Sequence, residues 1–162
     1  MVVDSFKFLP RSFRPLYEGR GPFPGEEKLV WSPYGKRLAD SRITLLSSAG
    51  FYVKASQQAF DLESEKARPE WGDPTWRPIP SDAQPEELGI AHLHINDEDL
   101  LADPEIALPM RGLAELVTPT AFHVALMGYQ HRALKDWHRT AAGEIVQLLR
   151  EQQTDGLILA PA

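Results

Sequence analysis

Short apolar runs separated by helix-type patterns predict a chain in which strands alternate with helices. The runs at 43–46 and 157–159 are continuous and border glycine-containing turns, which is typical of strands buried on both faces. A further strand is predicted at 88–96, and residues 139–152 place apolar side chains at helical spacing. Strands joined through helices form mostly parallel sheets with right-handed crossovers. The pattern therefore predicts an α/β fold, a Rossmann-like domain of three layers.

Prolines interrupt this pattern in two regions. The sequence has 14 prolines, and they cluster in residues 10–33 and 69–85, which we expect to be irregular. Aromatic side chains stand between the prolines of the first region, as in an arm that packs onto this domain or onto a second subunit. We therefore divide the chain into an irregular N-terminal arm at 1–40 and an α/β domain at 41–162. The long connection at 56–87 is interpreted as a functional segment or a lid.

Composition narrows the range of partners. A chain of 162 residues with 43% hydrophobic and 25% charged residues suits one domain in water, and its net charge of −6 disfavours nucleic acid and membrane surfaces. No apolar run reaches membrane-spanning length, and the first residues lack the apolar core of a secretory signal. We expect a cytoplasmic protein with small-molecule or protein partners. The absence of cysteine excludes disulfides, thiolate metal ligands and thiol catalysis by the residues present.

Two histidines carry the first candidate chemistry. His92 and His94 alternate on the strand predicted at 88–96, so we expect both side chains on one face, where a His-x-His pair can supply two metal ligands. No third ligand is identifiable, and we interpret the pair as hydrogen-bonded groups that line a cleft rather than as a metal site. Asn96 follows at the strand end, where it could bind substrate, whereas the acidic residues at 97–99 are better explained as helix caps.

The remaining candidates lie in a loop and in an apolar segment. His123 falls inside an apolar segment and Tyr129 at its end; each could act as a general acid, but a hydrogen-bonded role in the core is commoner. Ser48 and Gly50 follow the first strand without the glycine spacing of a phosphate loop or a dinucleotide fingerprint, and no nucleophile elbow is present. The sequence thus predicts no cofactor and gives little support to a serine hydrolase.

Seven segments, taken in order along the chain, together resemble one known family. They are VDSFKFLPRSFRPLYEG, SRITLLSSAGFYV, GDPTWRPIPSD, IAHLHIN, ALPMRGLAEL, FHVALMGY and DGLILAPA. The set is similar to the selenoprotein B subunits of glycine, sarcosine, betaine and D-proline reductases, especially to short, stand-alone members. The resemblance spans nearly the whole chain.

The last of these segments carries a specific implication. In the family that it resembles, the segment similar to DGLILAPA is followed directly by a selenocysteine or a cysteine, then by two residues and a further cysteine. Selenocysteine is encoded by UGA, which is ordinarily read as a stop. The resemblance therefore implies a chain cut at the codon after Ala162 and an α/β domain that is incomplete at its C-terminus. Apolar sheet surface left uncovered by such a cut is expected to produce a homo-oligomer.

The resemblance also implies a mechanism, the reductive cleavage of a C–N bond in a small amino-acid-like substrate. A selenolate attacks the carbon that bears the nitrogen, the amine leaves, and a partner reductase or thiol protein resolves the selenoether. Since carboxyl ends of parallel strands share one sheet edge, we expect Ala162 at the same edge as Ser48, Gly50 and Asn96. In this interpretation the catalytic residues are His92, His94 and His123, and the substrate-binding residues are Ser48, Gly50, Asn96 and Tyr129.

A scaffold or binding subunit without catalytic activity is the competing hypothesis. Such a subunit would be complete at Ala162 and would use its aromatic N-terminal arm for assembly. The nucleotide triplet that follows codon 162 distinguishes the two hypotheses, because UGA in a continuing frame with a nearby cysteine codon favours the reductase.

Overall fold

The computed structural model describes residues in three ranges, 33–68, 71–127 and 134–161. The chain divides into two compact units, Met1–Gly35 and Lys36–Ala162, and the second contains all the helices and strands described below. Most of the expected N-terminal arm, as well as Tyr129 and Ala162, lies outside the described residues.

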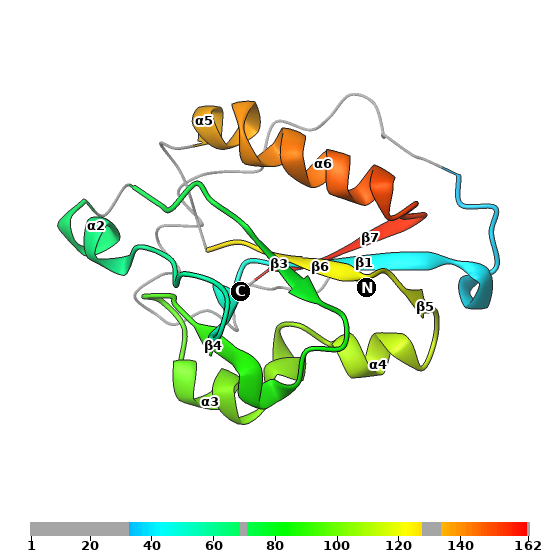
Figure 1. Cartoon of the computed structure of the whole chain (residues 1–162), viewed down its shortest axis with the longest axis horizontal. Coiled ribbons are helices and arrows are strands. Elements are labelled where there is room, and N and C mark those ends of the chain that lie inside the picture. Colours follow the sequence, from blue (N-terminus) through cyan, green and yellow to red (C-terminus); the bar gives the residue numbers. More distant parts are fainter. Residues whose placement is uncertain (1–32, 69–70, 128–133, 162) are drawn as a thin grey trace, which may run out of the picture. The chain divides into compact units, whose positions relative to one another are not determined.

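A mostly parallel sheet forms the centre of the second unit (Figure 1). Its strands are β1 (Arg42–Ser47), β3 (Arg77–Pro80), β5 (Thr118–Pro119), β6 (Phe122–Ala125) and β7 (Gly156–Ala160). β7 runs parallel to β1 along one of its edges, and β5 and β6 follow one another along the other edge, also parallel to β1. β3 pairs with β6 and is antiparallel to it. The predicted mostly parallel α/β sheet is confirmed.

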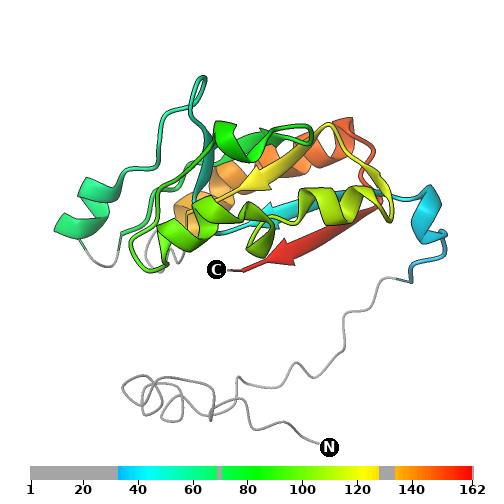
Figure 2. The same cartoon turned by 90° about the horizontal axis from the view of Figure 1, so that it is seen from below.

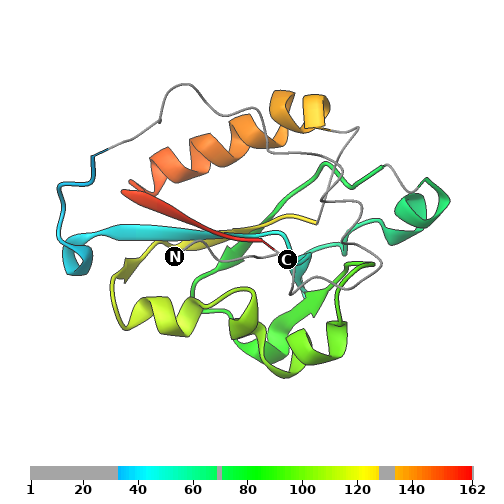
Figure 3. The same cartoon turned by 180° about the vertical axis from the view of Figure 1, so that it is seen from behind.

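Helices cover both faces of this sheet, as Figures 1 and 3 show from opposite sides. One face carries α5 (Leu134–Arg139) and α6 (Ala141–Glu151), and the other carries α3 (Asp97–Ala102) and α4 (Met110–Ala114). Side chains alternate along β1, so that Leu45 belongs to the same apolar cluster as Leu113 of α4, whereas Leu46 packs against the cluster of Ile145 in α6. The expected three layers are therefore present, and the helical spacing in residues 139–152 corresponds to α6.

The strand predicted at 88–96 is wrong in its length and its partner. The strand β4 ends at Ile90 (Leu88–Ile90) and pairs antiparallel with β2 (Phe51–Val53) in a separate two-stranded sheet. The cause is a turn directly after β1, where Gly50 adopts a φ of 73° and directs the chain out of the main sheet. β2 then pairs with β4, and His92 and His94 lie after the end of β4.

The last strand is also different from its prediction. β7 is an edge strand, paired with β1 among the described strands, and Figure 2 shows it as the outermost strand of the sheet. Leu157, Ile158 and Leu159 are all exposed, so the expected burial on both faces is wrong. An apolar run indicates a strand, but only the neighbouring elements decide whether both of its faces are covered.

The connection at 56–87 has structure of its own. It contains α2 (Leu62–Ala67), the strand β3 and the 3₁₀ turn η3 (Pro85–Glu87). Two further 3₁₀ turns are η2 (Leu38–Asp40) and η4 (Pro104–Ile106). Within the described ranges, no helix is both long enough and apolar enough to cross a membrane.

Candidate functional site

The carboxyl ends of three parallel strands meet at one edge of the main sheet. Ser47 of β1 is in register with Ala125 of β6 and with Ala160 of β7. Beyond the strand, the Ser48 N–H donates a hydrogen bond to the Ala160 carbonyl at 3.3 Å. The expected parallel orientation of β7 is confirmed, and its carboxyl end opens beside the loop that follows β1, although Ala162 itself is outside the described residues. In open α/β sheets this edge is where ligands bind.

Gly50 attaches a further segment to this edge. Its N–H donates to the Leu126 carbonyl at 2.8 Å, and its carbonyl accepts from the Ala91 N–H at 3.0 Å. A Cβ atom on Gly50 would lie 2.2 Å from the Ala91 carbonyl oxygen, so only glycine allows the two backbones to approach this closely. His92 follows Ala91 directly, and it is therefore held next to the carboxyl ends of β1 and β6.

His92 and His94 are neighbours, but they do not share a strand face as expected. The backbone bends after Ala91, so that His92 is buried and His94 is exposed. The His94 N–H donates to His92 Nδ1 at 3.1 Å, and the two rings meet edge to face with centroids 5.9 Å apart. The prediction of one shared face is wrong because it assumed the two-residue repeat of a strand.

The hydrogen bond to His92 fixes the state of its ring. Because Nδ1 accepts from a backbone N–H, this hydrogen bond favours the neutral imidazole with its hydrogen on Nε2. Burial lowers the pKa of His92; the nearby His94 lowers it further, whereas Asp97 raises it. An Nε2 that bears hydrogen is unavailable to a metal ion. Throughout the described part of the chain, no three histidine, aspartate or glutamate side chains are grouped so as to hold one.

Glu65, which the sequence analysis did not single out, approaches this pair from α2. Asp61 caps the helix by accepting a hydrogen bond from the Ser64 N–H at 2.9 Å, and Glu65 then faces inward. Its Oε1 lies 3.3 Å from Nε2 of His94, and its Oε2 is buried with no hydrogen-bond partner among the described residues. The one signal in the sequence is that Glu65 stands three residues after Leu62, at a position on the same helix face.

Asn96 begins the next helix. Its side-chain oxygen accepts from the Glu98 N–H at 3.2 Å, and its Nδ2 donates to Asp99 at 2.7 Å, so it is the N-cap of α3. Asp97 Oδ1 is buried and has no partner within the described ranges. The polar groups of Asn96 are thus occupied by the helix start, and its role in substrate binding stays a prediction.

His123 lies inside the main sheet. It is fully buried on β6, and its Nδ1 accepts a hydrogen bond from the Leu45 N–H at 3.1 Å. On this side of β1 the neighbouring strand changes from β5 to β6 near Leu45. The His123 ring therefore takes the place of a backbone acceptor for the Leu45 N–H. Burial lowers the pKa of His123 to about 4. His123 is therefore a buried, hydrogen-bonded core residue, and its catalytic role stays a prediction.

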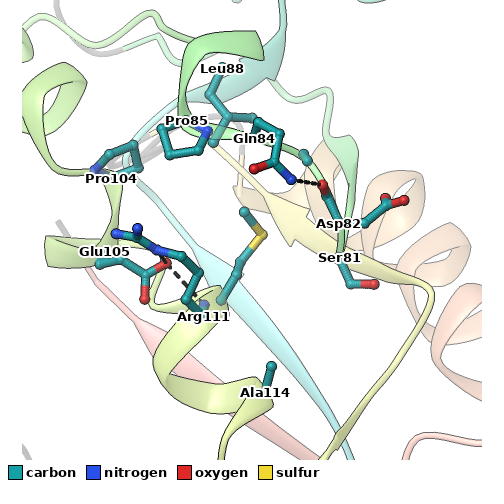
Figure 4. Close-up of a pocket in the computed structure, with 11 residues that line it drawn as sticks. Ser81, Asp82, Gln84, Pro85, Leu88, Pro104, Glu105, Arg111 and Ala114 are labelled. Atoms are coloured by element: carbon teal, nitrogen blue, oxygen red, sulfur yellow. Dashed lines mark hydrogen bonds and ion pairs between the residues drawn. The ribbon is translucent and has the colours of Figure 1, made fainter.

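A small pocket lies elsewhere in the domain (Figure 4). Its volume is about 110 Å³, and Glu105 and Arg111 face each other at its rim. The Glu105 carboxylate already accepts from the N–H groups of Arg111 and Gly112 in the first turn of α4, each at 3.0 Å. None of the predicted site residues lines this pocket. Among the described residues, three buried polar atoms without a hydrogen-bond partner belong to Glu65, His92 and Asp97, near the histidine pair, and three more belong to His123, Trp137 and Gln152.

Comparisons with known proteins give a distant relationship. The chain is 28% identical over 136 residues to the D-proline reductase subunit gamma of Acetoanaerobium sticklandii, an alignment that covers 80% of this chain and 52% of the relative. The chain thus spans about half the length of that curated relative. No family model matches the chain. No solved structure matches it either. An identity of 28% makes the chain a distant relative of a reductase subunit.

Proposed function

We propose that the chain is a selenoprotein B-like reductase subunit that cleaves a C–N bond in a small amino-acid-like substrate. The distant relationship to a D-proline reductase subunit supports a reductase function. The observation that carries the proposal is the position of the carboxyl end of β7, next to the loop at Ser48, which Gly50 joins to the His92 segment. In this proposal the nucleophile is a selenocysteine or cysteine directly after Ala162, as in the family that the chain resembles, and the 162 residues themselves contain no cysteine.

The reaction is a displacement followed by a reduction. The selenolate or thiolate attacks the carbon that bears the nitrogen, forming a C–Se or C–S bond as the C–N bond breaks. The nitrogen leaves with the bonding electron pair and takes up a proton. A dithiol on a partner protein then attacks the selenium or sulfur, and the carbon departs with the electron pair and a proton. The second thiol closes a disulfide on the partner and frees the nucleophile, so the dithiol supplies both electrons.

The site residues divide by their exposure. His94 is exposed and can reach a bound substrate. His92 is buried, and its Nδ1 orients the backbone of His94 by accepting a hydrogen bond from the His94 N–H. We place the substrate against the loop of Ser48 and Gly50, in which the Ser48 N–H donates to the Ala160 carbonyl of β7. In the proposed reaction, His94 supplies the proton to the leaving amine.

A scaffold without catalytic activity is the second candidate, and one observation favours it. Leu157, Ile158 and Leu159 are exposed on the edge strand β7, and an exposed apolar edge is typical of a surface that joins another chain. An assembly role would use this edge and would need no nucleophile.

The residue that follows Ala162 in the native protein separates the two candidates. Peptide mapping by mass spectrometry, together with the nucleotide sequence, should show selenocysteine or cysteine at that position and a further cysteine three residues later. A native C-terminus at Ala162, or a UAA or UAG triplet, contradicts the reductase and leaves the scaffold.

A further inference from the structure

Glu65 is a carboxylate in a position where a helix normally buries an apolar side chain. It is 7% exposed, whereas Glu63 and Lys66 on the same helix are exposed and pair with each other at 2.7 Å. Burial of an ionised carboxylate destabilises a fold unless the charge is paired and its oxygens accept hydrogen bonds. Oε2 has no partner in the described part of the chain, so the contacts described there leave half of this carboxylate uncompensated.

The partner of Glu65 is a histidine rather than a permanent cation. Within the described residues, its ion pair is with His94, whose Nε2 lies 3.3 Å from Oε1 and whose side chain is 70% exposed. A lysine or arginine would neutralise a buried carboxylate at every physiological pH, whereas a histidine gains and loses its proton near neutrality. The choice of partner therefore favours proton transfer over a purely structural ion pair.

The surroundings fix the orientation of His94. A carboxylate oxygen only accepts hydrogen bonds, so Glu65 favours the form of His94 with hydrogen on Nε2, which leaves the lone pair on Nδ1. The backbone of His94 is held in turn, because its N–H donates to His92 Nδ1 at 3.1 Å. The exposed imidazole is thus anchored at its main chain and at one ring nitrogen, and the other nitrogen is available to a ligand.

We infer that Glu65 and His94 form a carboxylate–imidazole dyad that delivers a proton at the carboxyl edge of the sheet. The inference rests on the proposed function for the identity of the proton acceptor, the leaving amine. His94 touches the substrate and is the catalytic residue, whereas Glu65 acts through His94 and is a positioning residue. Protonated His94 gives its Nδ1 proton to the nitrogen that departs with the C–N electron pair. It then regains a proton from water, while Glu65 keeps the ring in position.

Nuclear magnetic resonance of the uniformly ¹⁵N-labelled full chain tests the dyad without any enzymatic assay. The His94 Nε2–H proton should resonate downfield of a free imidazole N–H and exchange with water more slowly than the N–H of an exposed histidine without a carboxylate partner. Glu65→Leu, which removes the acceptor and its charge, should abolish this signal. The remaining resonances should keep the chemical-shift dispersion of a folded chain. Glu65→Gln, which keeps an oxygen acceptor without the charge, should retain a weaker, upfield-shifted signal and serves as the conservative variant.

Glu63→Gln is the matched control, because Glu63 is an exposed glutamate on the same helix. It should leave the His94 signal unchanged. The inference is overturned if the wild-type chain shows no such proton, or if the signal persists in folded Glu65→Leu or Glu65→Gln with its position and exchange rate unaltered. A native C-terminus at Ala162 would instead remove the proposed function and leave the dyad intact. The two failures are therefore distinguishable.

Discussion

Gly50 and Ala91 approach each other so closely that no side chain fits between them. The Ala91 N–H donates to the Gly50 carbonyl at 3.0 Å, and a Cβ on Gly50 would meet the Ala91 carbonyl oxygen at 2.2 Å. This contact joins the loop after β1 to the segment that carries His92 and His94. The geometry of the candidate site therefore depends on one glycine.

Gly50→Ala should destabilise the fold and displace the histidine segment. Both the positive φ of 73° and the clash with backbone atoms oppose a methyl group, and we expect a loss of roughly 2 kcal/mol in the free energy of unfolding. Urea denaturation followed by circular dichroism measures this loss. Gly143→Ala is the control, since a Cβ there meets nothing within 4 Å and the residue lies inside α6. Gly143→Ala should raise the free energy of unfolding by up to about 1 kcal/mol. Equal stability of the Gly50 variant and the wild type would contradict the described contact.

The stability of the domain should fall as the pH is lowered from 6.5 to 4. The pKa of His123 is about 4 in the folded chain against 6.5 for the unperturbed group, so the unfolded chain binds the proton more tightly. Stability is then fully present above pH 6.5 and is lost progressively down to pH 4, by roughly 3 kcal/mol. The lowered pKa of His92 acts in the same direction.

His123→Asn isolates the contribution of one ring. The Asn side-chain oxygen can accept from the Leu45 N–H, as Nδ1 does at 3.1 Å, but it does not titrate. We expect lower stability at pH 7, because a buried ring is lost, and a much flatter dependence on pH. The measurement is the urea midpoint at several pH values between 4 and 7. An unchanged slope in the variant would show that His123 is not the titrating group.

The exposed edge of β7 should make the isolated chain self-associate. Leu159 is 64% exposed on an edge strand whose neighbours, Leu157 and Ile158, are also apolar and exposed. Leu159→Lys should shift the chain toward a monomer, because a charged residue blocks pairing along a sheet edge. Leu116→Lys is the matched control, since Leu116 is 62% exposed and lies outside the sheet. Sedimentation velocity measures the change, and a wild-type chain that is monomeric at all concentrations contradicts the prediction.

The sequence predicted the parts of the fold that depend on local pattern. The apolar run of β1 and the helical spacing of α6 specify these elements by themselves, and together they imply the parallel sheet. The antiparallel β2–β4 pair was missed because it depends on the turn at Gly50, whose partner Ala91 is distant in sequence. The exposure of Leu157, Ile158 and Leu159 was not predicted, because the sequence of a strand does not specify which elements cover it.

The site was predictable only in part. His92 and His94 were identified by their spacing, and they are indeed neighbours, although through a bend rather than a strand face. Glu65 was not identified, because a glutamate in a polar helix normally faces solvent. Its burial is a product of tertiary packing, and only the three-dimensional structure brings its carboxylate to His94.

Amine release with and without a nucleophile after Ala162 tests the proposed reductase most directly. Each of three chains is incubated with a panel of small amino acids and a dithiol. The chains are residues 1–162, the chain extended by its natural selenocysteine or cysteine, and the same extension with serine at that position. We predict that only the selenocysteine or cysteine chain releases amine and gains the mass of a covalent substrate adduct, because residues 1–162 contain no thiol or selenol. Release at the same rate by residues 1–162 or by the serine chain would contradict the proposed function.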